Sequence, residues 1–319
     1  MTIYHYQAPK PLIFLNFDIN GTIVSLDTAE KTLPEGRICV ELAKVLVKKW
    51  DERSEPMTFE KYVDTVLYPA NAEAAKNTKE RFMEWLEETA HPDREEIFQE
   101  YERIKELFTD SETGQINLDQ IYPSFVYALE KLEEQGADYR ICLRTFGFDL
   151  EKVVKQIQDS SWAKRLNIHF VHRGAFNGDQ ESNKNSFEFN KKRIEDIQEV
   201  FDTFVNSKEH FAIQDNYMRW KNNQEQARFG KPFLFPKDHF WKDREVICLM
   251  FDDYGHRIVS PVDVNTGEEL KAQETPSLIV VNTFDAITKR DYFWKKILEC
   301  IRQASPDYAS QLEAGKESV

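Results

Sequence analysis

An apolar segment near the N-terminus of this 319-residue chain ends in a carboxylate. The segment Leu12–Phe17 leads into Asp18, and Asn20, Gly21 and Thr22 follow. The pattern predicts a buried strand that places Asp18 at the C-terminal edge of a sheet. The ligand crevice of an open α/β sheet lies at that edge, so Asp18 is a candidate nucleophile or metal ligand. Asp-x-Asn-Gly also occurs in hairpin turns and calcium loops, but neither the second strand of a hairpin nor the alternating ligands of a calcium loop follow here.

A second apolar segment ends in a hydroxyl residue. The run Tyr139–Arg144 leads to Thr145, and Gly147 follows two residues later. The pattern predicts another strand whose last side chain lies at a sheet edge. Alternatively, Thr145 caps a helix that begins near Asp149, which is a common role for threonine.

A third apolar segment, Glu245–Phe251, ends in two adjacent carboxylates, Asp252 and Asp253. Such a pair also fits a solvated turn. If this strand neighbours the first, however, Asp18 and Asp252 repel each other, and a divalent cation with oxygen ligands relieves the repulsion. Asp215 follows a shorter apolar run and is the alternative ligand; Asp252 is favoured by its longer strand and the second Asp.

In this order, the three segments resemble motifs of the haloacid dehalogenase (HAD) superfamily of phosphohydrolases. Asp18–Thr22 resembles the first motif, Asp-x-Asp-Gly-Thr, with Asn20 in place of the second Asp. Thr145 resembles the hydroxyl residue of the second motif, and Asp252 with Asp253 resembles the fourth.

The remaining HAD motif is a lysine upstream of the paired carboxylates. Lys231 is the preferred candidate because Gly-Lys-Pro at this position resembles the usual setting. Lys191, Lys192 and Lys237 are alternatives.

The resemblance implies phosphoryl transfer through an aspartyl-phosphate, with Asp18 as nucleophile and Mg²⁺ as cofactor. Phosphate would be held by Gly21, Thr145 and Lys231. The implied metal ligands are the Asp18 carboxylate, the backbone carbonyl at Asn20, Asp252 and Asp253. The substrate would be a small phosphorylated molecule.

Asn20 is the departure from the family pattern. The second Asp of HAD phosphatases transfers a proton to the leaving group, and an amide has no titratable proton for this step. General acid–base catalysis contributes about 10² to 10⁴ in rate. The chain is therefore expected to be an attenuated phosphatase, a catalytically impaired phosphate-binding or regulatory protein on the same fold, or a variant in which Asn20 was introduced to trap a complex.

Helix and strand patterns alternate from residue 117 onward, which predicts βαβ units and a parallel sheet. With the resemblance, this gives an α/β fold: a Rossmann-like HAD core with a mostly parallel sheet flanked by helices, plus an inserted helical cap. The core is predicted over residues 1–30 and 112–308, the cap over 31–111, and a flexible tail over 309–319. Residues 174–187 are expected to form a loop.

The net charge of −14 disfavours nucleic acid and anionic membranes as main partners. No apolar stretch approaches the roughly 20 residues of a membrane span. The first residues lack the pattern of a signal peptide. Four widely spaced cysteines fit structural thiols in a reducing compartment, so a cytoplasmic enzyme is expected.

Overall fold

The computed structural model describes residues 10–25, 32–110, 113–177, 186–189 and 191–314. The chain divides into two compact units. The core unit consists of Met1–Ile23, Ile121–Asn282 and Lys289–Val319, and the helical unit of Val24–Gln120 and Thr283–Thr288. The predicted boundaries at 30/31 and 111/112 lie outside the described residues, as do residues 315–319 of the predicted tail.

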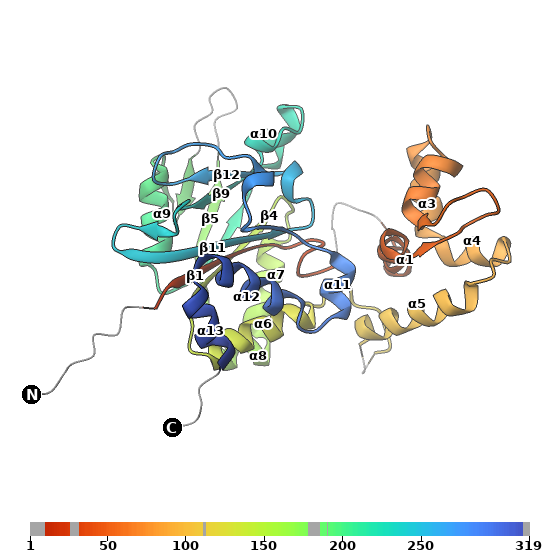
Figure 1. The fold of residues 1–319 in the computed structure, drawn as a ribbon, viewed down its shortest axis with the longest axis horizontal. Coiled ribbons are helices and arrows are strands. Elements are labelled where there is room, and N and C mark those ends of the chain that lie inside the picture. Colours follow the sequence, from red (N-terminus) through yellow and green to blue (C-terminus); the bar gives the residue numbers. More distant parts are fainter. Residues whose placement is uncertain (1–9, 26–31, 111–112, 178–185, 190, 315–319) are drawn as a thin grey trace, which may run out of the picture. The chain divides into compact units, whose positions relative to one another are not determined.

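A nine-stranded sheet runs through the described part of the core unit (Figure 1). Its strand order is β10 (Phe240–Trp241), β11 (Arg244–Asp252), β1 (Leu12–Asp18), β4 (Asp138–Thr145), β8 (His210–Gln214), β5 (Phe170–Phe176), β6 (Phe187–Phe189) and β7 (Lys192–Ile194), and β13 (Leu278–Val280) also pairs with β11. Parallel pairs join β13, β11, β1, β4, β8 and β5. Antiparallel pairs add β10, β6 and β7. The predicted α/β class with a mostly parallel sheet is confirmed.

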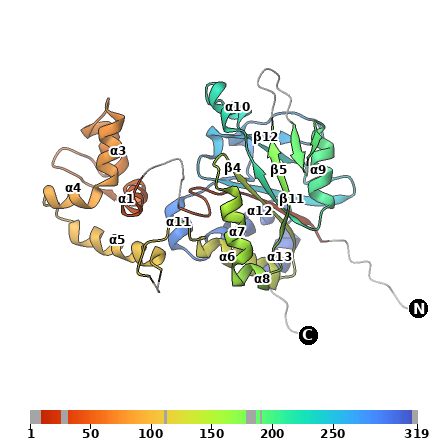
Figure 2. The same cartoon turned by 180° about the vertical axis from the view of Figure 1, so that it is seen from behind.

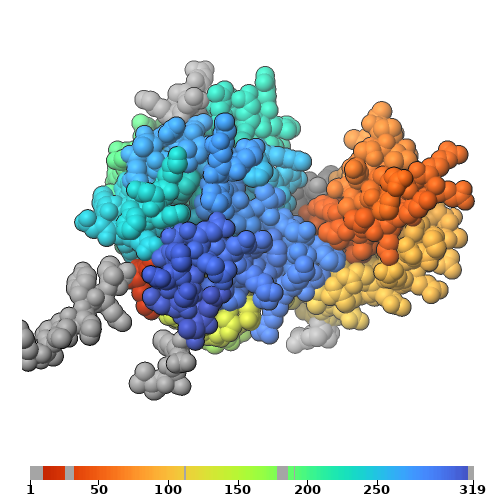
Figure 3. All heavy atoms as spheres, viewed as in Figure 1, coloured from red at the N-terminus to blue at the C-terminus, as the bar shows by residue number. Residues whose placement is uncertain are grey.

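Helices cover both faces of this sheet (Figure 2). On one side lie α6 (Pro123–Glu134), α7 (Leu150–Asp159), α8 (Ser161–Arg165), α12 (Tyr292–Ala304) and α13 (Pro306–Ala314); on the other lie α9 (Ile197–Asn206) and a parallel pair made of β9 (Lys231–Phe235) and β12 (Val259–Asp263). Shorter elements are α10 (Tyr217–Asn222) and the 3-10 turns Ala227–Phe229, Gly255–Arg257 and Ala272–Glu274. In the space-filling view the dark blue C-terminal helices leave only a small red patch of the N-terminal strand visible (Figure 3).

Side chains alternate between the two faces of β1, as the pleat requires. Phe14 packs against Phe204 of α9, with ring centroids 5.0 Å apart. Phe17 points the other way, where its ring lies 4.9 Å from Phe125 of α6 and 5.4 Å from Phe293 of α12. All seven residues of β1 are buried. Asp18 shares the parity of Phe14, so its side chain belongs to the face covered by α9 and β9.

Two sequence predictions about the core unit need correction. The flexible tail predicted over 309–319 is wrong for 309–314, because these residues belong to α13, where Tyr308, Ala309 and Leu312 are buried. The predicted loop over 174–187 is wrong at both ends: β5 extends to Phe176 and β6 begins at Phe187, and the two strands pair. Residues 178–185 of that loop lie outside the described residues.

The helical unit has an aromatic core. Phe59 stacks on Phe82 with ring centroids 4.0 Å apart, and Trp50 contacts both rings. The elements of this unit are α1 (Pro34–Val45), β2 (Val47–Lys48), β3 (Met57–Thr58), α2 (Phe59–Tyr62), the π-helix Val63–Leu67, α3 (Ala72–Glu80), α4 (Phe82–Glu88), α5 (Arg94–Phe108) and α11 (Thr283–Thr288). On α5, the predicted apolar face is confirmed, since Ile97, Tyr101, Ile104 and Phe108 are buried.

None of the helices formed by the described residues combines the length and apolar character that a membrane crossing requires.

Candidate active site at the C-terminal end of the first strand

The sheet changes its direction of winding next to β1. From β1 the chain adds β4, β5 and then β8 on one side, with β8 inserted between β4 and β5, whereas β11 and β13 extend the sheet on the other side. In open α/β sheets, the carboxyl ends of the strands beside such a switch point border the ligand crevice. Asp18 is the last residue of β1, and Asp252 is the last residue of the adjacent β11. The fold therefore brings these two carboxylates to the expected place.

A buried lysine joins the two carboxylates. The ammonium group of Lys231 donates hydrogen bonds to Asp18 Oδ1 and, over 2.9 Å, to Asp252 Oδ2. Lys231, Asp18 and Asp252 are 2%, 5% and 0% exposed, so almost no water screens these charges. The two strands are neighbours, and the cation that the structure shows between their carboxylates is the ammonium group of Lys231.

Lys231 reaches this position because it opens β9, which lies over the same sheet face. Its backbone N–H donates to the Ile258 carbonyl over 2.6 Å, next to β12. The preceding residue is Gly230, and a Cβ there would overlap the same carbonyl. Only glycine allows this close approach, so the Gly-Lys pair in the sequence has a steric reason.

Burial and nearby negative charges have the opposite effect to Lys231 on the pKa of Asp18. Burial raises the pKa of Asp18 well above its ordinary value; Lys231 lowers it, and Asp252 and Asp253 raise it further. Burial lowers the pKa of Lys231, but the carboxylates of Asp18, Asp252 and Asp215 more than offset this effect, so its pKa is raised. Lys231 is therefore positively charged.

A tight turn fixes the second carboxylate. Asp252 Oδ1 accepts hydrogen bonds from the backbone N–H groups of Tyr254 (2.9 Å) and Gly255 (2.8 Å). The side chain of Asp253 lies against Gly21, whose φ is +73° and whose missing Cβ would overlap that carboxylate. Gly21 therefore provides both the left-handed turn after Asp18 and room for Asp253.

Thr145 ends β4, the other neighbour of β1, and does not cap the next helix. Its Oγ1 accepts a hydrogen bond from Gly147 N over 2.8 Å and donates to Asp149 Oδ1 over 3.4 Å. Asn20 lies nearby, since its Nδ2 is 3.1 Å and Thr145 Oγ1 is 3.2 Å from the position that a Cβ on Gly147 would occupy. Asn20 Oδ1 is buried and has no hydrogen-bond partner among the described residues.

Asp215, the alternative metal ligand, forms a buried ion pair with Arg144. Arg144 donates to Asp215 through Nε (3.0 Å) and Nη2, and its Nη1 donates to the Pro232 carbonyl over 2.9 Å. Burial lowers the pKa of Arg144, but Asp215 raises it by more, so the guanidinium remains charged. Asp215 thus belongs to a bidentate pair, while Asp252 is the carboxylate that shares a lysine with Asp18.

The alternative lysines lie on the surface. Lys192 is 70% exposed and pairs with Glu199, and both Lys191 and Lys237 are exposed. Of the four candidates, only Lys231 contacts Asp18.

The oxygen donors at this site fit Mg²⁺ better than a softer metal. Among the described residues, no group of three or more His, Cys, Asp or Glu side chains is placed to hold a metal ion. Mg²⁺ does not need such a cage, because it is usually bound by one or two carboxylates together with water and phosphate oxygens. Asp18, Asp252 and Asp253 bring three carboxylates against the single ammonium of Lys231, and Asp18 Oδ2 accepts no hydrogen bond from a described residue.

Aromatic side chains border the lysine. The Phe146 ring centroid is 5.2 Å from Lys231 Nζ, within cation–π range. Phe146 stacks on Trp220 (5.6 Å) and meets the edge of Tyr217 (5.8 Å), which is 42% exposed. Phe233 and Phe235, from the same aromatic-rich sequence region, are buried and stack on each other. The region therefore supplies core packing and also a partly exposed aromatic group at the site.

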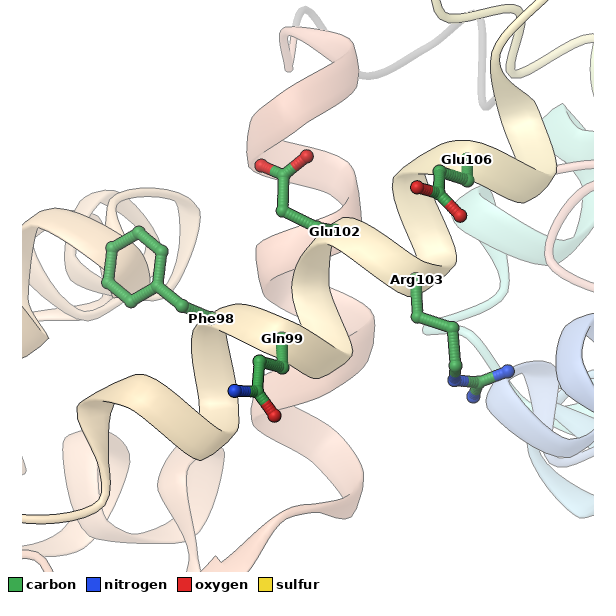
Figure 4. A pocket seen from close by; sticks show the side chains of 5 residues that line it. All are labelled: Phe98, Gln99, Glu102, Arg103 and Glu106. Carbon is green, nitrogen blue, oxygen red and sulfur yellow. The ribbon is translucent and has the colours of Figure 1, made fainter.

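A separate hollow lies on the surface of the helical unit. It has a volume of about 380 Å³ and is lined by Phe98, Gln99, Glu102, Arg103 and Glu106. All five side chains come from one helix, α5 (Figure 4). One helix face cannot surround a ligand, and the hollow contains no nucleophile with an activating partner.

No family model, curated protein or solved structure matches this chain. This site is therefore supported by its geometry alone. Sequence reasoning missed Arg144 and Asp149 as members of the strand-end cluster. For Arg144 a signal existed, because a charged residue inside an apolar strand predicts a buried ion pair.

Proposed function

We propose that this chain is a Mg²⁺-dependent phosphohydrolase of the HAD type, acting on a small phosphorylated molecule. The observation that carries the proposal is the buried Lys231 that links Asp18 and Asp252 beside the switch point of the sheet. A buried carboxylate with an activating cation, at the edge where α/β folds bind ligands, suits nucleophilic attack.

In this proposal, Asp18 Oδ2 attacks phosphorus and forms an aspartyl-phosphate, which water then hydrolyses. Lys231 and the Thr145 hydroxyl bind the equatorial phosphoryl oxygens, together with the backbone at Gly21. Mg²⁺, held by Asp18, Asp252 and the backbone carbonyl at Asn20 with Asp253 beside them, would neutralise phosphate charge. Positioning and charge neutralisation supply most of the rate enhancement in such reactions.

The proposal is tested by replacing the nucleophile. Asp18→Asn keeps the shape of the side chain but removes its nucleophilic oxygen, so turnover of phosphomonoesters should fall to background. The assay uses 4-nitrophenyl phosphate and a panel of alkyl phosphates, each with Mg²⁺ and with EDTA. Asp159→Asn, at the exposed C-terminal end of α7, is the matched control and should retain full turnover. Metal-independent turnover, or turnover that survives Asp18→Asn, would contradict the proposal.

A second candidate function is a phosphate-binding or regulatory protein with an impaired site. Asn20 favours it, because an amide cannot transfer the proton that the leaving group needs. In that case Mg²⁺ with inorganic phosphate should raise the melting temperature of the chain, and hydrolysis should stay at background. Robust Mg²⁺-dependent phosphatase activity of the unmodified chain would exclude this function.

A further inference from the structure

Asp149 is a buried carboxylate without an evident structural task. It is 5% exposed and precedes α7. Although it occupies the N-cap position, its side chain accepts no capping hydrogen bond from the helix. Among the described residues, its carboxylate accepts one hydrogen bond, the 3.4 Å contact from Thr145 Oγ1, and forms no ion pair. Buried carboxylates normally have stronger partners.

The carboxylate lies beside the side chains of Asn20 and Thr145. The position of a Cβ built on Gly147 is 2.7 Å from Asp149 Oδ1, 3.1 Å from Asn20 Nδ2 and 3.2 Å from Thr145 Oγ1. These three polar atoms therefore lie close together around Gly147, where a Cβ would overlap Asp149 Oδ1. Thr145 and Asn20 are the residues proposed above to border the transferring phosphoryl group.

Asn20 cannot supply the proton that this step of the reaction requires. Its amide has no titratable proton, and its Oδ1 is buried without a hydrogen-bond partner among the residues described. A proton donor is still needed when an alkyl phosphate is cleaved, since an alkoxide is a poor leaving group. Asp149 has neither a lysine nor an arginine partner among the described residues, and its Oδ1 and Asn20 Nδ2 lie 2.7 Å and 3.1 Å from the same point, the Cβ position at Gly147.

We propose that Asp149 is the general acid and base of this site, in the role that Asn20 cannot perform. The inference rests on the proposed phosphohydrolase function. Asp149 would act from the residue before α7, and not from the position two residues after the nucleophile.

The proton balance is simple. As Asp18 forms its bond to phosphorus, the bond from phosphorus to the leaving oxygen breaks, and protonated Asp149 gives its proton to that oxygen, releasing an alcohol. Water then attacks phosphorus, the acyl phosphate bond between Asp18 Oδ2 and phosphorus breaks, and the Asp149 carboxylate takes a proton from that water. Inorganic phosphate leaves with the oxygen of water, and Asp18 and Asp149 return to their starting forms.

The first experiment measures how Asp149→Asn changes turnover of two substrate types. Turnover of alkyl phosphates should fall by about 10² to 10⁴, the usual contribution of general acid–base catalysis. Turnover of 4-nitrophenyl phosphate should fall much less in its first step, since nitrophenolate leaves unprotonated; single-turnover release of nitrophenolate isolates that step. Asp159→Asn, on the same helix, is the control and should change neither. Equal losses for both substrate types would overturn the inference.

The second experiment asks whether an acid at position 20 makes Asp149 dispensable. Asn20→Asp in the Asp149→Asn background should recover at least tenfold of the lost alkyl-phosphate turnover, and the same change in the unmodified chain should give a smaller gain. If Asn20→Asp raises turnover equally in both backgrounds, Asp149 does not perform the proton transfer. Asp149→Ser gives the same comparison should Asp149→Asn fold poorly, as judged by circular dichroism.

The two proposals fail differently. Activity that depends on Asp18 but not on Asp149 overturns only the assignment of Asp149. Background turnover by the unmodified chain, with activity appearing in Asn20→Asp, also overturns that assignment, because Asp149 would then supply no proton. Background turnover in both proteins overturns the phosphohydrolase function and the inference together.

Discussion

In the core unit, Lys231 and Arg144 are 2% and 1% exposed, and their carboxylate partners are buried with them. In the helical unit, the bidentate pair of Arg103 with Glu100 lies on the surface of α5, with side chains 48% and 30% exposed. Buried charges are costly unless they are paired, whereas exposed pairs contribute little to stability. The comparison shows that the charges at the sheet edge are buried at a cost in folding free energy, and such buried charges often mark functional sites.

The largest expected effect is the loss of the shared lysine. Lys231→Met would leave Asp18 and Asp252 buried without their cation, so the free energy of unfolding should fall by about 3–5 kcal/mol. Lys192→Met removes an exposed lysine and should change it by at most about 0.5 kcal/mol. Urea denaturation without Mg²⁺ measures both. Similar values for the two variants would show that the sheet edge and the surface do not differ in this respect.

A buried histidine of the core unit should make stability depend on pH. Burial, followed by the charges of Arg140 and His169, lowers the pKa of His210 from 6.5 to about 4. Between these values the unfolded chain binds more protons than the folded chain. The stability due to neutral His210 is therefore fully present above about pH 6.5 and is lost as the pH falls toward 4.

His210→Asn tests this dependence, because an amide oxygen can replace Nδ1 as acceptor of the Ile141 N–H but cannot titrate. The decline in unfolding free energy from pH 6.5 to 4 should become smaller by up to about 3 kcal/mol. His256→Asn changes an exposed histidine and should leave the slope as it is. An unchanged slope in His210→Asn would assign acid sensitivity to other groups.

The smallest effects are expected within α5. Ile97→Val removes one methylene from a side chain that is 1% exposed, and should cost about 1 kcal/mol. Arg103→Ala removes the whole ion pair but should cost at most about 0.5 kcal/mol. Thermal unfolding of the two variants compares packing with surface charge on one helix. A larger loss for Arg103→Ala would contradict the view that the helical unit depends on its apolar core.

Local sequence pattern was sufficient for several elements. The apolar run that ends at Asp18 is β1, and the spacing of Ile97, Tyr101, Ile104 and Phe108 marks the buried face of α5. It failed at the C-terminal helix and at the β5–β6 pair. In both places short segments are stabilised by contacts with other elements, α13 by packing on α12 and β6 by pairing with β5 and β7, which a local pattern does not report.

What the sequence by itself determined is which residues end the strands, among them Asp18, Thr145 and Asp252. The parallel register of β1 with β4 and β11 then places Asp18, Arg144 and Asp252 on one face, because paired residues of neighbouring strands point the same way. Which of these residues meet was decided by the order of strands in the sheet. Lys231 contacts Asp18 across 213 residues of chain, Arg144 pairs with Asp215 across 71, and Asp149 faces Asn20 only because β4 lies beside β1. Periodicity reports local burial and carries no information on strand order, so tertiary structure alone assembles the site.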